Sequence, residues 1–190
     1  MRENKLIILV AESNAGKDTT LNAFVDMYDV KKVVSHTSRP MRSYEKEGVD
    51  YHFISREQFI QMEKDGLFIE SRHYNTIQDG QDTVWYYGVA KSEINLEEAS
   101  SIIIVDLHGL GELEDYFGKE SIISFYLDVD EGVRMNRALN RGDNKEEVIR
   151  RFEDDRIKFE LAREKTDHTI YNDGSLTPND IACLMYEKIV

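Results

Sequence analysis

Apolar residues along this chain fall into short runs that alternate with segments of helical period. The runs expected to form strands cover residues 5–10, 32–35, 102–106, 122–127 and 169–171. The segments expected to form helices cover residues 17–28, 112–117, 131–140, 146–164 and 178–189. Buried strands that alternate with helices are typical of an α/β domain with a largely parallel sheet. The hydrophobic pattern therefore predicts that fold class.

Residues 36–90 break this alternation. Aromatic-rich runs at 49–53, 67–74 and 84–89 predict short strands around one helix, in which Ser55 and Gln58 have capping-box spacing and Gly66 marks the end. The polar stretch 75–84 contains Asp79-Gly80 and predicts a hairpin or an excursion between two of the strands. This part of the chain is predicted to be an inserted subdomain of mixed β structure.

The last predicted helix carries two further signals. Thr177 is suited to the N-cap and Pro178 to the first helical position. Cys183 lies beside Leu184 in an apolar helical pattern, and we expect it to be buried. As the single cysteine, it cannot form a disulfide within the chain.

Composition narrows the classes of partner. Lys+Arg number 24 against 37 Asp+Glu, a net charge of −13, which argues against a nucleic-acid partner because such proteins need a basic surface. The apolar runs at 6–11 and 102–105 are far shorter than the roughly 18 to 20 residues of a membrane helix. The N-terminal run is also too short for a signal peptide. We expect a cytoplasmic protein with no membrane partner.

Residues 11–20, AESNAGKDTT, follow the first predicted strand and open a helix. Gly16 and Lys17 match the phosphate-loop pattern GxxxxGK[ST], whereas Ala11 replaces its first glycine and Asp18 its hydroxyl. In such a loop, backbone N–H groups and the helix N-terminus face phosphate oxygens. An ordinary strand-to-helix turn is the alternative. The predicted phosphate-binding residues are Ala11, Glu12, Ser13, Asn14, Ala15, Gly16, Lys17, Asp18 and Thr19.

A second motif follows in residues 35–53, SHTSRPMRSYEKEGVDYHF, where Arg39 and Arg42 are spaced to bind one phosphate. Here the chain resembles the guanylate kinase family, in which S-x-T-x-R-x-x-R-x-x-E, G-x-D-Y and F-I-E segments follow a phosphate loop. The resemblance extends over nearly the whole chain. The matching residues are Ser35, Thr37, Arg39, Arg42, Glu45, Gly48, Asp50, Tyr51, Phe68, Ile69, Glu70, Tyr87, Gly88, Asp106, Gly109, Arg137, Arg141, Arg151, Asn172 and Asp173.

The resemblance implies an architecture. It is a three-layer P-loop kinase fold with a parallel core sheet, an inserted mixed-β subdomain that binds a nucleoside monophosphate, and a helical lid. Residues 1–190 would form a single domain. Its core would be 1–34 and 90–190, its acceptor-binding subdomain 35–89, and its lid about 137–152.

The resemblance also implies an activity: transfer of the γ-phosphoryl group of ATP to GMP or dGMP, with Mg²⁺. ATP would lie on the phosphate loop, and nucleotides would be the partners. Catalysis would need positive charge around the migrating group. The residues implied to supply it are Lys17, Arg42, Arg137, Arg141 and Arg151. For each lid arginine, pairing with acids of residues 145–156 is the alternative.

The acceptor site is implied by the same resemblance. Arg39, Arg42, Tyr51 and Tyr87 would hold the 5′-phosphate, because guanidinium and phenol groups donate to phosphate oxygens. Two carboxylates would accept hydrogen bonds from guanine N1 and its 2-amino group. The remaining GMP-binding residues would be Glu70 and Asp106 at these donors, Ser35 at the base, and Glu45 bracing the arginine and tyrosine cluster.

Two departures from the family pattern concern the metal. Ile104 stands where family members commonly carry an aspartate, and Asp18 stands where they carry a hydroxyl. One hypothesis is that Asp18 coordinates Mg²⁺, directly or through water, and replaces both groups. The alternative is that Thr19 has the metal role and Asp18 only favours the helix N-terminus.

Other departures leave the acceptor open. Val89 replaces a family hydroxyl, and residues 75–84 lengthen the spacing between Glu70 and Tyr87. The phosphate loop, the YYGV segment and residues 172–176 are also similar to ribose 1,5-bisphosphate phosphokinase, which is the alternative enzyme. A non-catalytic guanylate-kinase-like module that binds peptides is a third possibility, which the retained Lys17 and lid arginines disfavour. The oligomeric state stays open.

Overall fold

The computed structural model describes residues 3–78 and 81–190, and the chain divides into two compact units. Met1–Lys32 and Leu96–Val190 form the first, here called the core unit. Val33–Asn95 forms the second, here called the insert unit. The two units are described separately.

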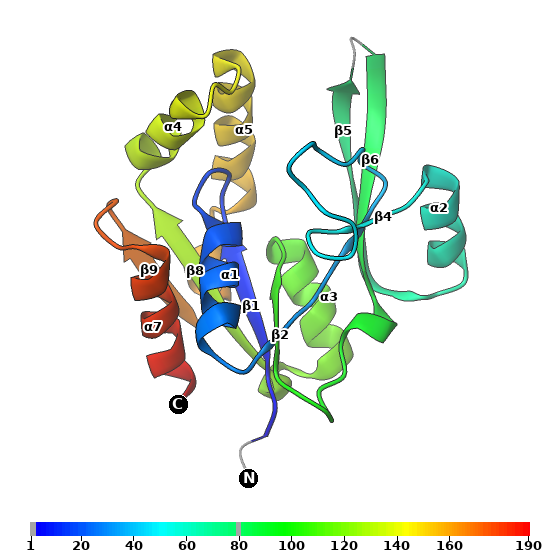
Figure 1. Ribbon diagram of the computed structural model, residues 1–190, viewed down its shortest axis with the longest axis vertical. Helices are drawn as coiled ribbons and strands as arrows, with labels where there is room; N and C mark the ends of the chain where they lie inside the picture. The colour runs from blue at the N-terminus through cyan, green and yellow to red at the C-terminus, as the bar shows by residue number, and fades with distance from the viewer. Residues whose placement is uncertain (1–2, 79–80) are drawn as a thin grey trace. The chain divides into compact units, whose positions relative to one another are not determined.

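The core unit is built on a five-stranded sheet in the order β2-β7-β1-β8-β9, in which every neighbouring pair is parallel (Figure 1). Strand β1 is at the centre, and all six of its residues, LIILVA, are buried. A continuous apolar strand of this kind needs cover on both faces of the sheet. The strands are β1 Leu6–Ala11, β2 Lys31–Lys32, β7 Ser101–Ile104, β8 Ile122–Val129 and β9 His168–Asn172.

Helices supply that cover. The connection from β1 to β2 runs toward one edge of the sheet and that from β7 to β8 toward the other, so right-handed crossovers place α1 and α3 on opposite faces. Helix α7 packs beside α1, and Figure 1 shows both on the near side of the sheet. The predicted three-layer α/β fold is confirmed. The helices are α1 Lys17–Met27, α3 Leu107–Phe117, α4 Glu131–Asn140, α5 Lys145–Lys158, α6 Ala162–Lys165, α7 Pro178–Ile189 and the 3₁₀ turn η2 Lys119–Ser121.

The insert unit contains a four-stranded mixed sheet in the order β4-β3-β6-β5. Strands β5 and β6 form an antiparallel ladder as far as the pair Gln78↔Gln81, so residues 75–78 and 81–84 continue the two strands, in agreement with the hairpin that was one of the two predicted arrangements. Asp79 and Gly80, where the turn was predicted, lie outside the described residues. The elements are β3 His36–Thr37, β4 His52–Phe53, α2 Arg56–Lys64, β5 Phe68–Gln78, β6 Gln81–Ala90 and the 3₁₀ turn η1 Lys91–Glu93.

Local capping signals were read correctly. Ser55 and Gln58 form both hydrogen bonds of a capping box at the start of α2, and Gly66 after its end has φ +66°. Thr177 caps α7, with Pro178 in its first turn. Such signals depend only on neighbours in sequence, which is why they can be predicted without the fold.

Three predicted elements were wrong in their bounds. The helix expected over 146–164 is broken after Lys158, because Phe159 leaves the helix and its ring stacks on Tyr126 at a centroid distance of 6.5 Å. The strand expected over 32–35 is split, since Lys31–Lys32 belongs to the core sheet and His36–Thr37 to the insert sheet. The helix expected at 112 begins at Leu107, with Asp106 as its N-cap.

The expected burial of Cys183 was also wrong, because its side chain is exposed. Helix α7 turns Ile181, Ala182 and Met185 toward the core. Cys183 follows this face by one residue and so points away from it. The apolar pattern of this helix did not fix which of its members lie at the edge of the buried stripe.

Replacing Ser55 by alanine should lower the free energy of unfolding by about 1 kcal/mol, because the Gln58 backbone N–H loses its acceptor. Ser92→Ala, at an exposed serine of η1, is the matched control and should change stability by less than about 0.5 kcal/mol. Urea denaturation followed by circular dichroism would measure both. Equal values for the two variants would contradict the capping role.

Candidate active site

The loop between β1 and α1 has the backbone geometry of a phosphate loop. Asn14 has φ +62° and Gly16 has φ +89°, so both adopt the left-handed conformation, which asparagine enters more readily than most residues with a side chain. A side chain at Gly16 would meet the Arg137 guanidinium at 3.3 Å as well as suffer that strain. Lys17 opens α1 directly after this turn. The loop thus leads backbone N–H groups into a helix N-terminus.

Two of the predicted lid arginines contact this loop from the end of α4, Arg137 in its last turn and Arg141 as the residue that follows it. Arg137 Nη1 donates to the Ala15 carbonyl oxygen at 2.8 Å, and Arg141 Nη2 donates to Asn14 Oδ1 at 2.8 Å. They lie on one face of the helix because their spacing is four residues. The structure therefore brings Arg137 and Arg141 to the phosphate loop.

Arg151, the third lid arginine, lies elsewhere. Its Nε donates to Glu147 Oε1 at 2.7 Å within α5, one of the pairings that the sequence analysis had left open. The pKa of Glu147 falls to about 2, because Arg150 and then Arg151 hydrogen bond to its carboxylate. In this structure Arg151 contributes to an ion-paired helix surface.

Sequence reasoning missed a buried group next to the loop. Arg134, also on α4, lies 3.1 Å from Glu12 Oε2, and Asp155 on α5 accepts the Ser13 N–H at 2.7 Å. The signal for Arg134 was available, since it precedes Arg137 by three residues and shares its helix face. No local signal pointed to Asp155.

The predicted metal residues lie in the first turn of α1. Asp18 and Thr19 are both exposed, and the Thr19 hydroxyl donates to the Gly16 carbonyl oxygen at 2.7 Å. Ile104 ends β7, two residues before Asp106. Asp106 caps α3 by accepting the Gly109 N–H at 2.9 Å, so it follows the strand in which it was predicted.

In the insert unit, Arg39 and Glu45 form a buried ion pair. The distance from Arg39 Nη2 to Glu45 Oε1 is 2.7 Å, and their side chains are only 5% and 7% exposed. A second Glu45 oxygen accepts the Arg42 backbone N–H at 2.7 Å. Burial alone would raise the pKa of Glu45, but these hydrogen bonds outweigh it and hold the pKa below its usual range. Glu45 braces both arginine positions, as the resemblance implied.

Aromatic rings surround this ion pair. The Arg39 guanidinium lies 5.5 Å from the centre of the Tyr51 ring and 5.7 Å from that of Phe53. Tyr51 and Tyr87 meet edge to face, with ring centroids 6.0 Å apart. Burial alone would lower the pKa of Arg39, but hydrogen bonds with Glu45 and Tyr87 raise it on balance. The insert unit thus gathers Arg39, Tyr51 and Tyr87 in one place.

The remaining acceptor residues differ in exposure. Arg42 is exposed, and its Nη1 donates to the Tyr44 hydroxyl at 3.0 Å. Ser35 is half-buried, and its carbonyl oxygen accepts the His52 N–H at 2.9 Å. Asp106 belongs to the core unit and is described there.

Glu70 is buried on β5 and forms an ion pair with Arg72, a partner that sequence reasoning missed. Residues two apart on a strand share one face, so the pair could have been expected. Val89 is paired with Glu70 across the ladder and is also buried. A Cβ at the adjacent Gly88 would lie 3.1 Å from the Glu70 carbonyl oxygen and 3.0 Å from Phe59 and Phe68, so only glycine lets the strands and rings approach this closely.

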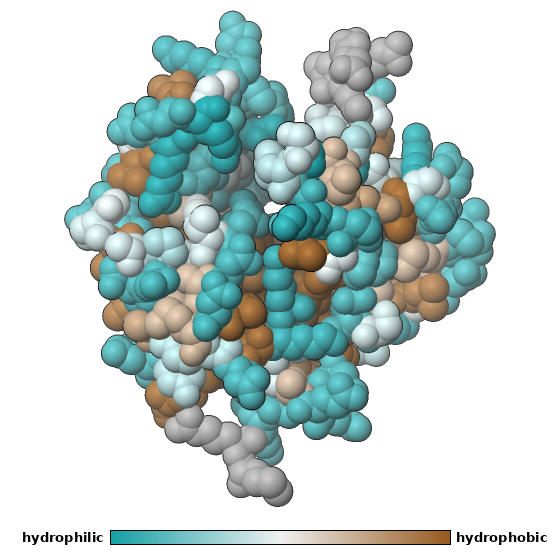
Figure 2. Space-filling model, viewed as in Figure 1, coloured by the Kyte–Doolittle hydropathy of each residue, from teal (hydrophilic) through white to brown (hydrophobic). Residues whose placement is uncertain are grey.

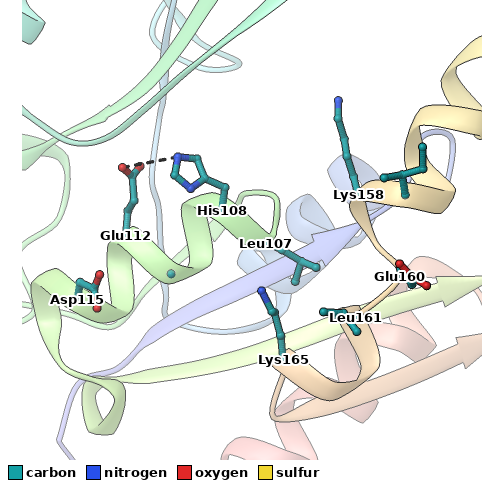
Figure 3. A pocket seen from close by; sticks show the side chains of 10 residues that line it. Leu107, His108, Glu112, Asp115, Lys158, Glu160, Leu161 and Lys165 are labelled. Carbon is teal, nitrogen blue, oxygen red and sulfur yellow. Dashed lines mark ion pairs between the residues drawn. The ribbon is translucent and has the colours of Figure 1, made fainter.

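A separate cavity of about 690 Å³ lies in the core unit between α3 and the α5–α6 connection (Figure 3). Acidic and histidine side chains come from α3, and two lysines come from the other wall. None of the predicted site residues lines it. The lining residues are Leu107, His108, Gly111, Glu112, Asp115, Ile157, Lys158, Glu160, Leu161 and Lys165.

The molecular face in Figure 2 is largely hydrophilic, with apolar side chains in small separate areas. Across residues 3–78 and 81–190, the helices are too short or too polar to cross a lipid bilayer.

Replacing Glu45 by glutamine should destabilise the protein by about 3 kcal/mol, the lower end for breaking a buried ion pair. Because the folded-state pKa of Glu45 is lowered, its contribution is present above its unfolded value of 4.5 and is lost as the pH falls toward the folded value. The difference between wild type and variant should therefore shrink below about pH 4.5. Urea denaturation between pH 7 and pH 3 would measure it.

Glu131→Gln is the matched control, because Glu131 pairs with Arg156 on the surface, where the two side chains are 45% and 62% exposed. It should cost less than about 1 kcal/mol. An equal loss in both variants would argue against a special role for the buried pair.

Comparison with known proteins identifies relatives. The family model for guanylate kinase matches residues 3–174. A guanylate kinase of Desulfotalea psychrophila is 30% identical over 177 residues, which cover 91% of this chain and 83% of that protein. One of Malacoplasma penetrans is 26% identical over 194 residues, covering 100% of this chain and 96% of that protein.

The fold has a counterpart among solved structures. The crystal structure of guanylate kinase from Anaplasma phagocytophilum matches with a TM-score of 0.69 at 21% identity, covering 100% of this chain and 86% of that chain. This likeness shows the shared fold, and the sequence match over 3–174 confirms the resemblance seen in the motifs. The chain belongs to the guanylate kinase family.

Proposed function

We propose that this protein transfers the γ-phosphoryl group of ATP to GMP or dGMP, giving ADP and GDP or dGDP. Its family membership supports the reaction class. The observation that carries the acceptor assignment is the Arg39–Glu45 pair with Tyr51 and Tyr87 beside it in the insert unit. A fixed guanidinium among phenol groups is a binding site for a phosphate monoester.

The acceptor's 5′-phosphate would bind Arg39, Arg42, Tyr51 and Tyr87. Arg39 donates to Glu45 and to the Pro40 carbonyl oxygen through its two Nη atoms. A guanidinium has five N–H donors, so beside these three hydrogen bonds and the one with Tyr87 Arg39 keeps one donor for a phosphate oxygen. Arg42 is exposed and can turn its guanidinium from Tyr44 to the same phosphate.

The base would be recognised by carboxylates. Glu70 and Asp106 would accept hydrogen bonds from guanine N1 and its 2-amino group, with Ser35 assisting. Adenine lacks this pair of donors, so it would leave a buried carboxylate without them. Glu70 is only 1% exposed, which makes such a loss costly. Arg72, its ion-pair partner, keeps positive charge beside this carboxylate.

ATP would lie on residues 11–19 of the phosphate loop. An oxygen of the acceptor phosphate attacks the γ-phosphorus of ATP while the bond between that phosphorus and the bridging oxygen of ADP breaks. The protein forms no covalent bond with the migrating phosphoryl group. Lys17, Arg137, Arg141 and Arg151 would place positive charge around the migrating group. Residues 35–89 would act as the acceptor-binding subdomain and 137–152 as the lid, whose closure excludes water.

Mg²⁺ fits the first turn of α1. Asp18 is an exposed carboxylate there, and the Thr19 hydroxyl donates a hydrogen bond to the Gly16 carbonyl oxygen, which leaves the lone pairs of the hydroxyl oxygen directed away from that bond and able to coordinate a cation. Mg²⁺ prefers one or two carboxylates together with phosphate oxygens. We propose Asp18 as the residue that holds the ion, directly or through water, and Thr19 as a second one. When bound, the ion would neutralise charge on the ATP phosphates.

A panel of acceptors tests the proposed function. With ATP and Mg²⁺, release of ADP should be confined to GMP and dGMP and absent with AMP, UMP, CMP, dTMP and ribose 1,5-bisphosphate. Arg39→Met should lower kcat/KM for GMP by about a hundredfold or more, because it removes a charge-assisted phosphate contact. Turnover of ribose 1,5-bisphosphate alone would identify the alternative enzyme. No turnover with any acceptor, together with no ATP binding, would favour a binding module.

The metal assignment has its own test. Asp18→Ser should abolish Mg²⁺-dependent turnover, and adding Ile104→Asp should restore part of it by returning a carboxylate to the end of β7. Asp26→Ser, in the last turns of α1, is the control and should leave the Mg²⁺ titration unchanged. Unchanged activity of Asp18→Ser would assign the metal role to Thr19.

A further inference from the structure

Three charged side chains next to the phosphate loop are buried, although none was assigned a contact with substrate through its side chain. Glu12 is 8% exposed, Arg134 3% and Asp155 7%. They come from the loop, from α4 and from α5. Arg134 lies 3.1 Å from Glu12 and 3.8 Å from Asp155, so one cation joins two carboxylates from different elements.

This group holds one residue of the loop, Ser13, through the two peptide groups on either side of its Cα. Asp155 Oδ2 accepts the Ser13 N–H at 2.7 Å, and Arg134 Nη1 donates to the Ser13 carbonyl oxygen at 3.4 Å. Arg134 is itself fixed, because its Nε donates to the Val129 carbonyl oxygen at 3.1 Å and its guanidinium lies 4.5 Å from the Phe152 ring centre. Ser13 is thus tied to a rigid support.

The orientation of the loop follows from these contacts. Arg134 binds the carbonyl oxygen of Ser13, and Arg137 binds that of Ala15. A trans peptide unit points its carbonyl and its N–H in opposite directions. The N–H groups of Asn14 and Gly16 therefore point away from α4. This leaves them free of the arginines and available to an anion.

Burial of these three charged side chains has a cost in folding free energy. Burial raises the pKa of Glu12, and the nearby Asp155 adds to this, while Arg134 and a hydrogen bond with Tyr126 oppose it. A buried ion pair often contributes less to stability than apolar residues of the same size would. This buried group has two carboxylates and one guanidinium. It is therefore better explained by the loop geometry that it imposes than by a gain in stability.

We infer that Asp155 and Arg134 are positioning residues, which hold the backbone N–H and carbonyl oxygen of Ser13 so that the phosphate loop is already shaped for ATP before the nucleotide binds. The inference deepens the proposed function, because it rests on ATP binding at this loop. Without these residues, ATP binding would have to order the loop at its own cost. Loss of these residues would weaken the binding of ATP and leave the binding of GMP unchanged.

The test compares ATP binding by variants at neighbouring acids of α5. Calorimetric titration with ATP and Mg²⁺, without acceptor, should show that Asp155→Ala weakens binding by about tenfold or more, since a hydrogen bond to a charged group is lost. Asp155→Asn should recover most of the affinity, because its amide oxygen can still accept the Ser13 N–H. Asp154→Ala is the control, because Asp154 pairs with Arg150 on the surface. In turnover, Asp155→Ala should raise KM for ATP and leave KM for GMP unchanged.

Equal ATP affinity of Asp155→Ala and Asp154→Ala would overturn the inference, as would a parallel rise of both KM values or a failure of Asp155→Asn to recover binding. The wild-type protein supplies a measurement that needs no variant. Amide hydrogen exchange by NMR should show the Ser13 N–H protected in the absence of nucleotide, and fast exchange there would also overturn the inference. If the wild-type protein binds ATP but does not phosphorylate GMP, the proposed function is contradicted. The comparison of ATP binding between the Asp155 and Asp154 variants can still be made in that case.

Discussion

The structure of the core unit depends on burying β1 on both faces of its sheet. All six residues of this strand are buried, so helices must cover the sheet from either side. The chain therefore has to turn sharply at Ala11 and enter α1, and it does so through the left-handed residues Asn14 and Gly16. Parallel strands also bring the carboxyl ends of β1, β7 and β8 to one edge. The phosphate loop follows β1, Asp106 follows β7 and α4 follows β8, so these candidate nucleotide-binding parts come directly after the carboxyl ends of the strands.

In an acidic chain that binds anionic nucleotides, the placement of the positive side chains matters more than the net charge. The net charge is −13, and several arginines of the candidate site and of the helices near it lie against carboxylates. Arg39 is held by Glu45, Arg134 by Glu12 and Asp155, and Arg151 by Glu147. Such pairing fixes the guanidinium groups in place without making the surface basic. Average charge thus describes the solubility of this chain better than it describes its ligand.

The parts that sequence could predict are those in which neighbours decide the structure. The phosphate loop, the capping box at Ser55 and the N-cap Thr177 were all visible in a few consecutive residues. The break of the predicted helix after Lys158 was not visible in this way, because it depends on Phe159 packing on Tyr126 of strand β8. Asp155 was missed for the same reason, since its partner Ser13 is 142 residues away in the chain. The Glu70–Arg72 pair could have been found from strand periodicity alone.

Strand β5 has a consequence for the behaviour of the protein at high concentration. It is the outermost strand of the insert sheet and runs for 11 residues, so one side of its backbone has no neighbouring strand in the sheet as described. Long open edges can recruit strands from other molecules. Arg72 places a charge within this strand, and charged side chains disfavour pairing of an edge with another copy of itself. Strand β5 is therefore a poorer template for edge-to-edge association than an uncharged apolar edge of the same length would be.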